Sequence, residues 1–301
     1  MMWNLKKLGY LTMRNLKLYF KDKMTFFVSL ITPVILFVLF ATFLKSTYEK
    51  QLIAIVGEGI LPTSLINAFS GGWLFSSVLA TSCITVAFCS GIMIIDKINN
   101  ADIDFKVTPI KNYILKLSYV LANMLSTFIV CFVFLIIGLI YLGIVGFYLT
   151  FLDVLLIIAN IILTSLFGTL LANIIWSFTR SQGVMSSICT LVSALYGFIC
   201  GAYMPISTMG EGIKNFTSLL PGTYSTILFR QGFLNGTLDK MLEYVHSPMV
   251  DAIKQSFDVS YIAFGTNIPT WAMYLIILLT SVVLLILLII ISTIKIRRIK
   301  K

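Results

Sequence analysis

Charged residues are scarce in this sequence, and that scarcity decides the class of protein. Only 11% of the 301 residues are Asp, Glu, Lys or Arg, whereas 58% are hydrophobic, and the mean hydropathy is +0.98. A soluble domain carries about 25% charged residues and cannot hide this much apolar surface from water. The composition therefore excludes a soluble globular protein and predicts an all-α polytopic membrane protein.

The sequence also lacks the groups that usually carry catalysis or bind metals. It has one histidine, His246, and no GxxxxGK[ST], GxSxG or HExxH motif. Its five cysteines lie in apolar runs without a CxxC pair, so we interpret them as small buried hydrophobic residues. We therefore expect no catalytic residue, no metal site and no cofactor in this chain.

Six apolar runs are near or above the ~20 residues that a helix needs to cross hydrocarbon. They cover residues 24–44, 72–95, 114–147, 152–178, 183–204 and 271–294. Before the first run, residues 1–23 place five basic side chains on one side of a helix and Leu and aromatic side chains on the other. This pattern is typical of an amphipathic helix on the membrane surface.

The positive charges gather on one predicted side of the membrane. Six spans put both termini together, and that side receives sixteen of the 22 Lys and Arg residues. Because cytoplasmic segments are enriched in Lys and Arg, we predict a multi-pass plasma-membrane protein with both termini in the cytoplasm. The positions of these charges indicate contact with anionic lipid headgroups and not nucleic acid. The lysine- and isoleucine-rich composition indicates a bacterial origin.

The chain divides into four predicted regions. Residues 1–23 form the amphipathic interfacial helix, and residues 24–204 hold the first five spans with a polar cytoplasmic loop at 96–113. Residues 205–269 form an extracellular segment, with a re-entrant hairpin up to Arg230 and a helical cap after it. Residues 270–301 form the sixth span and a basic cytoplasmic tail. We expect residues 45–71 to form a loop, because Gly57, Gly59 and Pro62 interrupt it.

Two stretches carry a resemblance to a known family. Gly201-Ala-Tyr-Met-Pro205, Leu219-Leu-Pro221-Gly-Thr-Tyr224 and Arg230 resemble the end of the fifth span and the outer hairpin of ATP-binding-cassette (ABC) type 2 exporter permeases. The polar segment Asp96–Pro109, with its Thr-Pro start to the third span, resembles the loop by which that family docks its ATPase. The order and spacing of these motifs cover nearly the whole chain. Importer permeases carry a Glu-Ala-Ala docking loop, which is absent, so the resemblance implies export.

The resemblance implies the roles of two residue sets, one for coupling to the ATPase and one for the outer hairpin, and we choose a third, the candidate cargo pathway, because its members face the middle of spans two and five. The ATPase-coupling set is Asp96, Asp102, Asp104, Phe105, Thr108 and Pro109. The cargo-pathway set, in the middle of spans two and five, is Phe75, Leu79, Ser82, Ile188, Val192 and Tyr196. The outer-hairpin set is Gly201, Pro205, Pro221, Tyr224 and Arg230.

The resemblance also implies partners and a cargo. A separate cassette ATPase would bind ATP and Mg²⁺, and a second permease copy or a paralogue would complete the transporter. The aromatic and aliphatic character of the pathway set favours an amphipathic or apolar cargo, such as a drug, an antimicrobial peptide or a lipid-linked molecule.

Two other hypotheses remain open. A self-contained channel or secondary carrier would need no ATPase, although the absence of ionisable residues inside the predicted spans disfavours ion coupling. A membrane-bound lipid-modifying enzyme would use the outer segment, where Glu243, His246 and Asp251 are the candidate groups.

Overall fold

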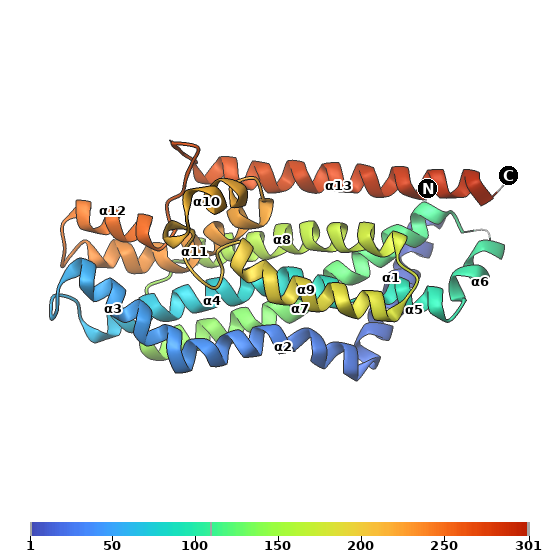
Figure 1. Ribbon diagram of the computed structural model, residues 1–301. Helices are drawn as coiled ribbons and strands as arrows, with labels where there is room; N and C mark the ends of the chain where they lie inside the picture. Colours follow the sequence, from blue (N-terminus) through green and yellow to red (C-terminus); the bar gives the residue numbers. More distant parts are fainter. Residues whose placement is uncertain (1, 109, 300–301) are drawn as a thin grey trace.

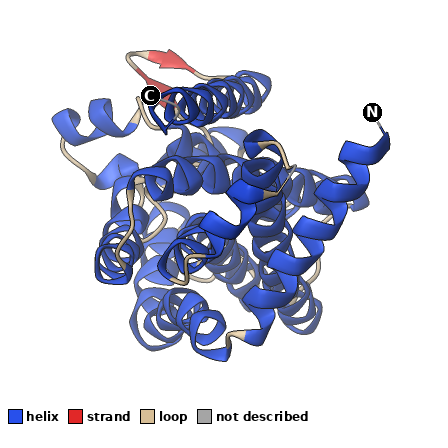
Figure 2. Ribbon diagram, turned by 90° about the vertical axis from the view of Figure 1, so that its right-hand side faces the viewer, coloured by secondary structure: helices blue, strands red, loops and turns tan. Residues whose placement is uncertain are grey.

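The computed structural model describes residues 2–108 and 110–299, without the side chains of 2, 3, 24, 25, 32, 41, 102, 106 and 292–299. Long helices run side by side along one axis, and α1 (Met2–Lys21) crosses one end of them (Figures 1 and 2). In the described part, six helical spans are long and apolar enough to cross a membrane. The prediction of an all-α polytopic fold with six transmembrane helices is confirmed.

The first span is longer than the sequence suggested. It comprises α2 (Lys23–Leu39), the π-helical turn η1 (Phe40–Leu44) and α3 (Lys45–Val56). The loop predicted over 45–71 is therefore wrong for most of its length, because only 57–62 separate α3 from α4 (Thr63–Cys89). The helix persists because Tyr48, Leu52 and Val56 recur every four residues and are all buried against the rest of the bundle.

The helix α4 is the centre of the bundle. Its most apolar window is 94% buried, and α2, α7, α8, α9 and α11 all pack around it. Three of its hydroxyl side chains, Ser76, Thr81 and Ser82, donate to carbonyls one turn earlier in the same helix. These groups therefore satisfy backbone carbonyls and do not face a cavity. Gly138 of α7 permits close packing, because a Cβ there would lie 2.9 Å from the Phe75 ring.

The remaining spans are α7 (Asn112–Val145), α8 (Phe151–Phe178), α9 (Gln182–Ile199) and α13 (Thr270–Ile299). The 34 residues of α7 extend about 51 Å at 1.5 Å per residue, which exceeds the roughly 30 Å hydrocarbon core. The two short helices α5 (Ile92–Ile98) and α6 (Ala101–Val107) join α4 to α7. They lie at the same end of the bundle as α1 and the end of α13 (Figure 1).

The opposite end is formed by α3 and by the segment that follows α9. This segment contains η2 (Ile206–Thr208), α10 (Glu211–Thr217), α11 (Pro221–Met241), α12 (Ser247–Ser256) and a hairpin of β1 (Ile262–Ala263) and β2 (Thr266–Asn267). Val250, Ile253 and Phe257 are buried, as the helical cap predicted.

The division predicted at Arg230 is not observed, because α11 runs through it as one helix of 21 residues. Two glycines let α11 approach its neighbours closely. A Cβ on Gly232 would lie 2.6 Å from Ile157, and a Cβ on Gly236 would collide with the Tyr148 carbonyl. Glycines that break a helix in isolation therefore serve helix packing here.

Candidate functional site

An ion pair at the α1 end joins four helices. The Arg14 guanidinium of α1 donates to both carboxylate oxygens of Asp96 in α5, at 2.6 and 2.9 Å. The Tyr119 hydroxyl of α7 donates to the same carboxylate at 2.6 Å, and the Arg14 guanidinium carbon lies 5.2 Å from the centroid of the Phe105 ring in α6. Its hydrogen bond to Asp96 raises the pKa of Arg14, although burial opposes this. One arginine thus ties α1, α5 and α6 to the third span.

A second basic side chain fastens α5 to the fourth span. Lys97 Nζ donates to the carbonyls of Trp176 and of Thr179, the latter at 2.9 Å, where α8 ends. The last carbonyls of a helix have no partner within the helix, and a cation there also interacts favourably with the helix dipole. Two adjacent residues of α5 therefore hold it to two spans, Asp96 to α7 and Lys97 to α8. A displacement of α5 would move these contacts.

The short helix α6 projects beyond this cluster at the end of the molecule (Figure 1). It packs mainly on α5, and Asn100 connects the two helices in the left-handed conformation, with φ of 58°. Ile103 and Val107, four residues apart, are 51% and 84% exposed, and Asp104 and Thr108 are exposed beside them. Two exposed apolar side chains, with polar groups beside them, therefore leave a small apolar surface at the tip of the molecule.

The coupling set predicted from sequence falls into two parts. Asp104 and Thr108 lie on the exposed tip, whereas Asp96 and Phe105 lie in the Arg14 cluster behind it. The Asp102 side chain and Pro109 lie outside the described residues. Sequence reasoning missed Arg14, Ile103 and Val107, although the spacing of the latter two within a polar segment is a visible signal.

A large apolar cavity opens between α2 and α9. Its volume is about 1060 Å³, and Cys89, Ile94, Ile95 and Ile98 of α4 and α5 lie at one end of it. The side walls are largely apolar. From α2 and η1 come Val28, Ile31, Ile35, Leu36, Leu39, Phe43 and Leu44, and from α9 come Gln182, Met185, Ser186, Cys189, Thr190, Ser193, Ala194 and Phe198.

The six residues predicted for the cargo pathway do not line this cavity. Phe75, Leu79 and Ser82 are at most 1% exposed within α4. Ile188, Val192 and Tyr196 lie on the face of α9 that packs into the core around α4 and α11. The cavity uses the other face of α9, where Gln182, Ser186, Thr190 and Ser193 recur at helical spacing; this polar pattern was a sequence signal that the prediction did not use.

The end opposite α1 contains a fully buried ion pair. Arg230 of α11 is 0% exposed and donates to Asp258 at 2.9 Å and to the Gly201 carbonyl. Its guanidinium carbon lies 4.8 Å from the centroid of the Trp73 ring. Asp258 also accepts hydrogen bonds from the backbone of Ile206 and, at 3.1 Å, of Ser207. We call this group of residues the outer clamp.

Burial disfavours the charged forms of Arg230 and Asp258 in the outer clamp. Burial raises the pKa of the Asp258 carboxyl and lowers the pKa of Arg230, and the attraction between the two groups opposes both shifts. The clamp joins the segment after α9 to α11, α4 and the turn after α12. It therefore fixes where α9 ends.

The five residues predicted for the outer hairpin are only partly brought together. Arg230 contacts Gly201, whereas Pro205 precedes η2, Pro221 begins α11, and the Tyr224 hydroxyl donates to the Ser218 carbonyl at 2.6 Å. Sequence reasoning missed Asp258 and Trp73, because both are distant in the chain and no motif marks them.

The three groups proposed for a lipid-modifying enzyme do not form a site. Glu243 pairs with Lys240 at 2.7 Å, and Asp251 lies 4.0 Å from Lys254. His246 is exposed. No cluster of His, Cys, Asp and Glu able to hold a metal ion occurs among the described residues.

Comparison with protein families matches residues 6–234 to the ABC-2 type transporter family. The matched region includes most of α1, the short helices α5 and α6, both walls of the large cavity and Arg230. Comparison with curated proteins finds no match. The match covers well over half of the chain, so this protein belongs to the ABC-2 type transporter family and is a multi-pass permease subunit of an ABC transporter, whose nucleotide hydrolysis lies in a partner cassette ATPase.

Proposed function

We propose that this permease exports an amphipathic or apolar cargo. The observation that carries the proposal is the cavity of about 1060 Å³ between α2 and α9, whose walls are mainly aliphatic and aromatic. Ligand sites of this kind are concave and mostly apolar, with a few polar groups that orient the ligand. Gln182, Ser186, Thr190 and Ser193 supply such polar groups along α9. Drugs, antimicrobial peptides and lipid-linked molecules have matching chemistry.

In this proposal the ATPase binds the tip of α6. Ile103 and Val107 supply apolar contact, and Asp104 and Thr108, with Asp102 and Pro109 of the same segment, supply the surrounding contacts. Movement of α6 would pass through Phe105 and Arg14 to Asp96, and then through Tyr119 to α7 and through Lys97 to α8. ATP and Mg²⁺ are bound by the partner and not by this chain.

The helix α9 is the element best placed to respond. Only 17% of its span is buried, and it packs mainly against α4 and α5. A shift of α5 would change the contact between α5 and α9 and would open or close the cavity, as a rigid-body switch between two states. The inner face of α9, with Ile188, Val192 and Tyr196, packs on the core cluster that includes Ile84 and Phe88 of α4, and it would slide on that part of α4.

A second permease copy or a paralogue would complete the transporter. The cavity is bounded by two spans that are only 25% and 17% buried, so a further subunit has room to cover it. We also propose that the α1 end faces the cytoplasm of a bacterial cell, because sixteen of the 22 Lys and Arg residues lie on that side of the predicted topology.

The proposal is tested by reconstituting the permease with its cassette ATPase in vesicles and measuring ATP-dependent movement of a fluorescent amphipathic dye. Ser193→Trp should fill the cavity, block dye movement and leave binding of the ATPase unchanged. Leu191→Trp is the matched control, because Leu191 lies on α9 outside the cavity and is 58% exposed. Equal transport by the two variants would contradict the assignment of the cavity.

A further inference from the structure

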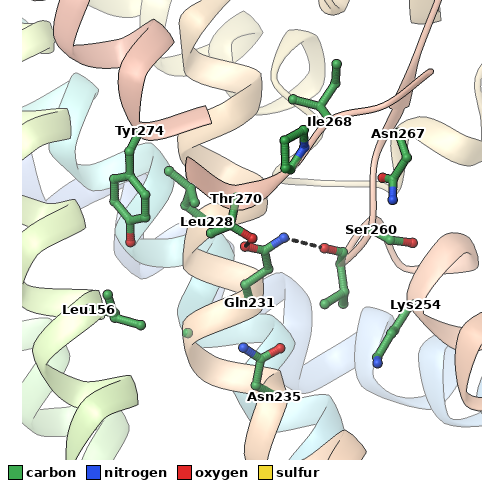
Figure 3. Close-up of a pocket in the computed structure, with 13 residues that line it drawn as sticks. Leu156, Leu228, Gln231, Asn235, Lys254, Ser260, Asn267, Ile268, Thr270 and Tyr274 are labelled. Carbon is green, nitrogen blue, oxygen red and sulfur yellow. Dashed lines mark hydrogen bonds between the residues drawn. The ribbon is translucent and has the colours of Figure 1, made fainter. Parts of the chain in front are cut away.

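A second, smaller pocket lies at the end of the bundle away from α1. Its volume is about 270 Å³, and it is enclosed by α8, α11, α12, the β-hairpin and the start of α13 (Figure 3). It is lined by Leu156, Leu228, Gln231, Gly232, Asn235, Lys254, Val259, Ser260, Asn267, Ile268, Pro269, Thr270 and Tyr274. This pocket shares no lining residue with the cavity between α2 and α9.

The pocket lies at a boundary between membrane and water. Leu156 and Tyr274 stand in the second turns of α8 and α13, the two spans that begin at Phe151 and Thr270. Trp271, at the start of α13, is 68% exposed, and exposed tryptophans are enriched where a span meets the headgroup region. A ligand here would therefore meet apolar spans on one side and the polar outer segment on the other.

The lining carries positive charge and hydrogen-bonding groups. Lys254 is the charged residue among the described residues that line the pocket, and its Nζ lies 4.0 Å from Asp251, which is too long for a strong hydrogen bond. Three uncharged polar residues, Asn235, Ser260 and Asn267, also line this space (Figure 3). These groups together can bind an anion that also carries hydroxyl or ester oxygens.

One wall of the pocket is already fixed in place. Gln231 donates to the Val259 carbonyl at 2.8 Å and accepts from the Thr270 hydroxyl at 3.1 Å. These bonds join α11 to the turn after α12 and to the first residue of α13 (Figure 3). A preorganised wall lowers the entropy lost when a ligand binds.

We propose that this pocket binds the phosphate ester headgroup of an anionic phospholipid. Lys254 would pair with the phosphate, Asn235, Ser260 and Asn267 would hydrogen-bond to its oxygens and to the glycerol, and the acyl chains would lie along α8 and α13 past Leu156 and Tyr274. The pocket volume is smaller than a typical site for a whole drug-sized ligand, which fits a headgroup whose chains remain in the bilayer. The bound lipid would fasten α13, which is only 17% buried, to α8 and α11.

The same phosphate chemistry is present in soluble glycerol phosphate, so the test must separate the two sources. The full chain, purified in a neutral detergent, would be titrated with phosphatidylglycerol, with phosphatidylcholine and with glycerol 3-phosphate, and thermal unfolding would be followed. A ligand that binds only the folded state raises the unfolding temperature in a concentration-dependent way. We expect phosphatidylglycerol to stabilise the chain and phosphatidylcholine to do so at least tenfold less effectively.

Lys254→Gln should raise the phosphatidylglycerol concentration needed for half of the thermal shift by tenfold or more. Lys240→Gln is the matched control, because Lys240 lies nearby but outside the pocket lining, and it should behave as the unchanged chain does. A Lys254-dependent shift produced equally by glycerol 3-phosphate would support the site and make the soluble ester its ligand. Equal responses of the two variants to phosphatidylglycerol, or no response to any ligand, would overturn the proposal.

Discussion

The two ends of the bundle each contain one arginine–aspartate pair, in opposite settings. At the α1 end the Arg14 side chain is 36% exposed and its partner Asp96 contacts α7, while Arg14 itself also contacts the exposed helix α6. At the other end Arg230 and Asp258 are 0% and 3% exposed and fix the segment after α9 among α4, α11 and α12. An arginine–aspartate pair is thus partly open to water at the α1 end and fully buried at the other end.

This difference matches what transport requires of each end. In the Arg14–Asp96 pair the arginine side chain is 36% exposed and can reach water, so the pair can separate at a lower cost than a fully buried one and can rearrange when a partner moves α6. A fully buried pair cannot be separated without leaving an unpaired charge in a low-dielectric interior, so it favours one arrangement strongly. We therefore predict that substitutions at the outer clamp reduce the stability of the fold. Substitutions in the Arg14–Asp96 cluster or in α6 should instead change how the permease communicates with the ATPase.

The largest effect is expected at the outer clamp. Arg230→Ala would leave Asp258 buried without its cation, and breaking a buried pair in this way costs about 3–5 kcal/mol. We expect a large loss of thermal stability and of folded protein in the membrane, measured by thermal unfolding in detergent. The double variant Arg230→Met with Asp258→Asn removes both charges and keeps an acceptor for the backbone, so it should recover part of the loss. If the double variant is no more stable than Arg230→Ala, the buried charge is not the cause.

A smaller effect on stability but a clear functional effect is expected at Asp96. Asp96→Ala removes the acceptor of Arg14 and Tyr119, and because Arg14 can then turn to water we expect a loss of about 1–3 kcal/mol. ATP hydrolysis by the partner should no longer respond to cargo, as measured by hydrolysis assays in lipid. Lys45→Ala disrupts a partly exposed pair with Glu49 outside this cluster and serves as the control. A cargo response that survives in Asp96→Ala would break the proposed chain of contacts.

The tip of α6 should affect assembly without affecting the fold. Val107→Asp places a charge at a side chain that is 84% exposed, so thermal stability of the isolated permease should stay within about 0.5 kcal/mol. Binding of the ATPase should weaken by about 1–2 kcal/mol, roughly five- to thirtyfold, as measured by titration of the purified subunits. Phe264→Asp is the matched control, because Phe264 is 63% exposed in the hairpin at the other end. Equal weakening by both variants would contradict docking at α6.

The smallest effect is expected at the junction between α5 and α6. Asn100 has φ of 58°, a conformation that costs a residue with a Cβ about 1–2 kcal/mol and that asparagine tolerates best after glycine. Asn100→Val should therefore reduce thermal stability slightly, whereas Asn100→Gly should leave it unchanged or raise it. A destabilising Asn100→Gly would show that the asparagine side chain, and not the backbone conformation, matters at this turn.

Local patterns predicted the spans, the amphipathic α1 and the helix that buries Val250 and Phe257, because length and periodicity are properties of a short stretch. Local patterns failed where contacts with distant parts of the chain determine the secondary structure. Residues 45–71 were predicted as a loop from local glycine and proline signals, whereas the helix there depends on the burial of Tyr48 and Leu52 against distant helices. Likewise, no local pattern shows that the glycines at 232 and 236 allow close packing against Ile157 and Tyr148.

For the candidate site, sequence patterns predicted the position of the polar segment but not the contacts that it makes with distant residues. The polar segment 96–113 was located correctly at one end of the bundle, since charge cannot remain in hydrocarbon, but its internal contacts depend on Arg14, which is 82 residues from Asp96. The large cavity was assigned to the wrong face of α9, because the prediction chose apolar residues and passed over the polar pattern of Gln182, Ser186 and Thr190 on the face that lines it.

The claim that most needs testing is that the cassette ATPase binds at the tip of α6. The five natural cysteines are buried, so a single introduced cysteine can be labelled selectively with a water-soluble maleimide. Val107→Cys and Phe264→Cys would be labelled with and without the ATPase bound in lipid. We predict that the ATPase protects the cysteine at position 107 and leaves the cysteine at position 264 reactive. Equal labelling of position 107 in the presence and absence of the bound ATPase would contradict the account.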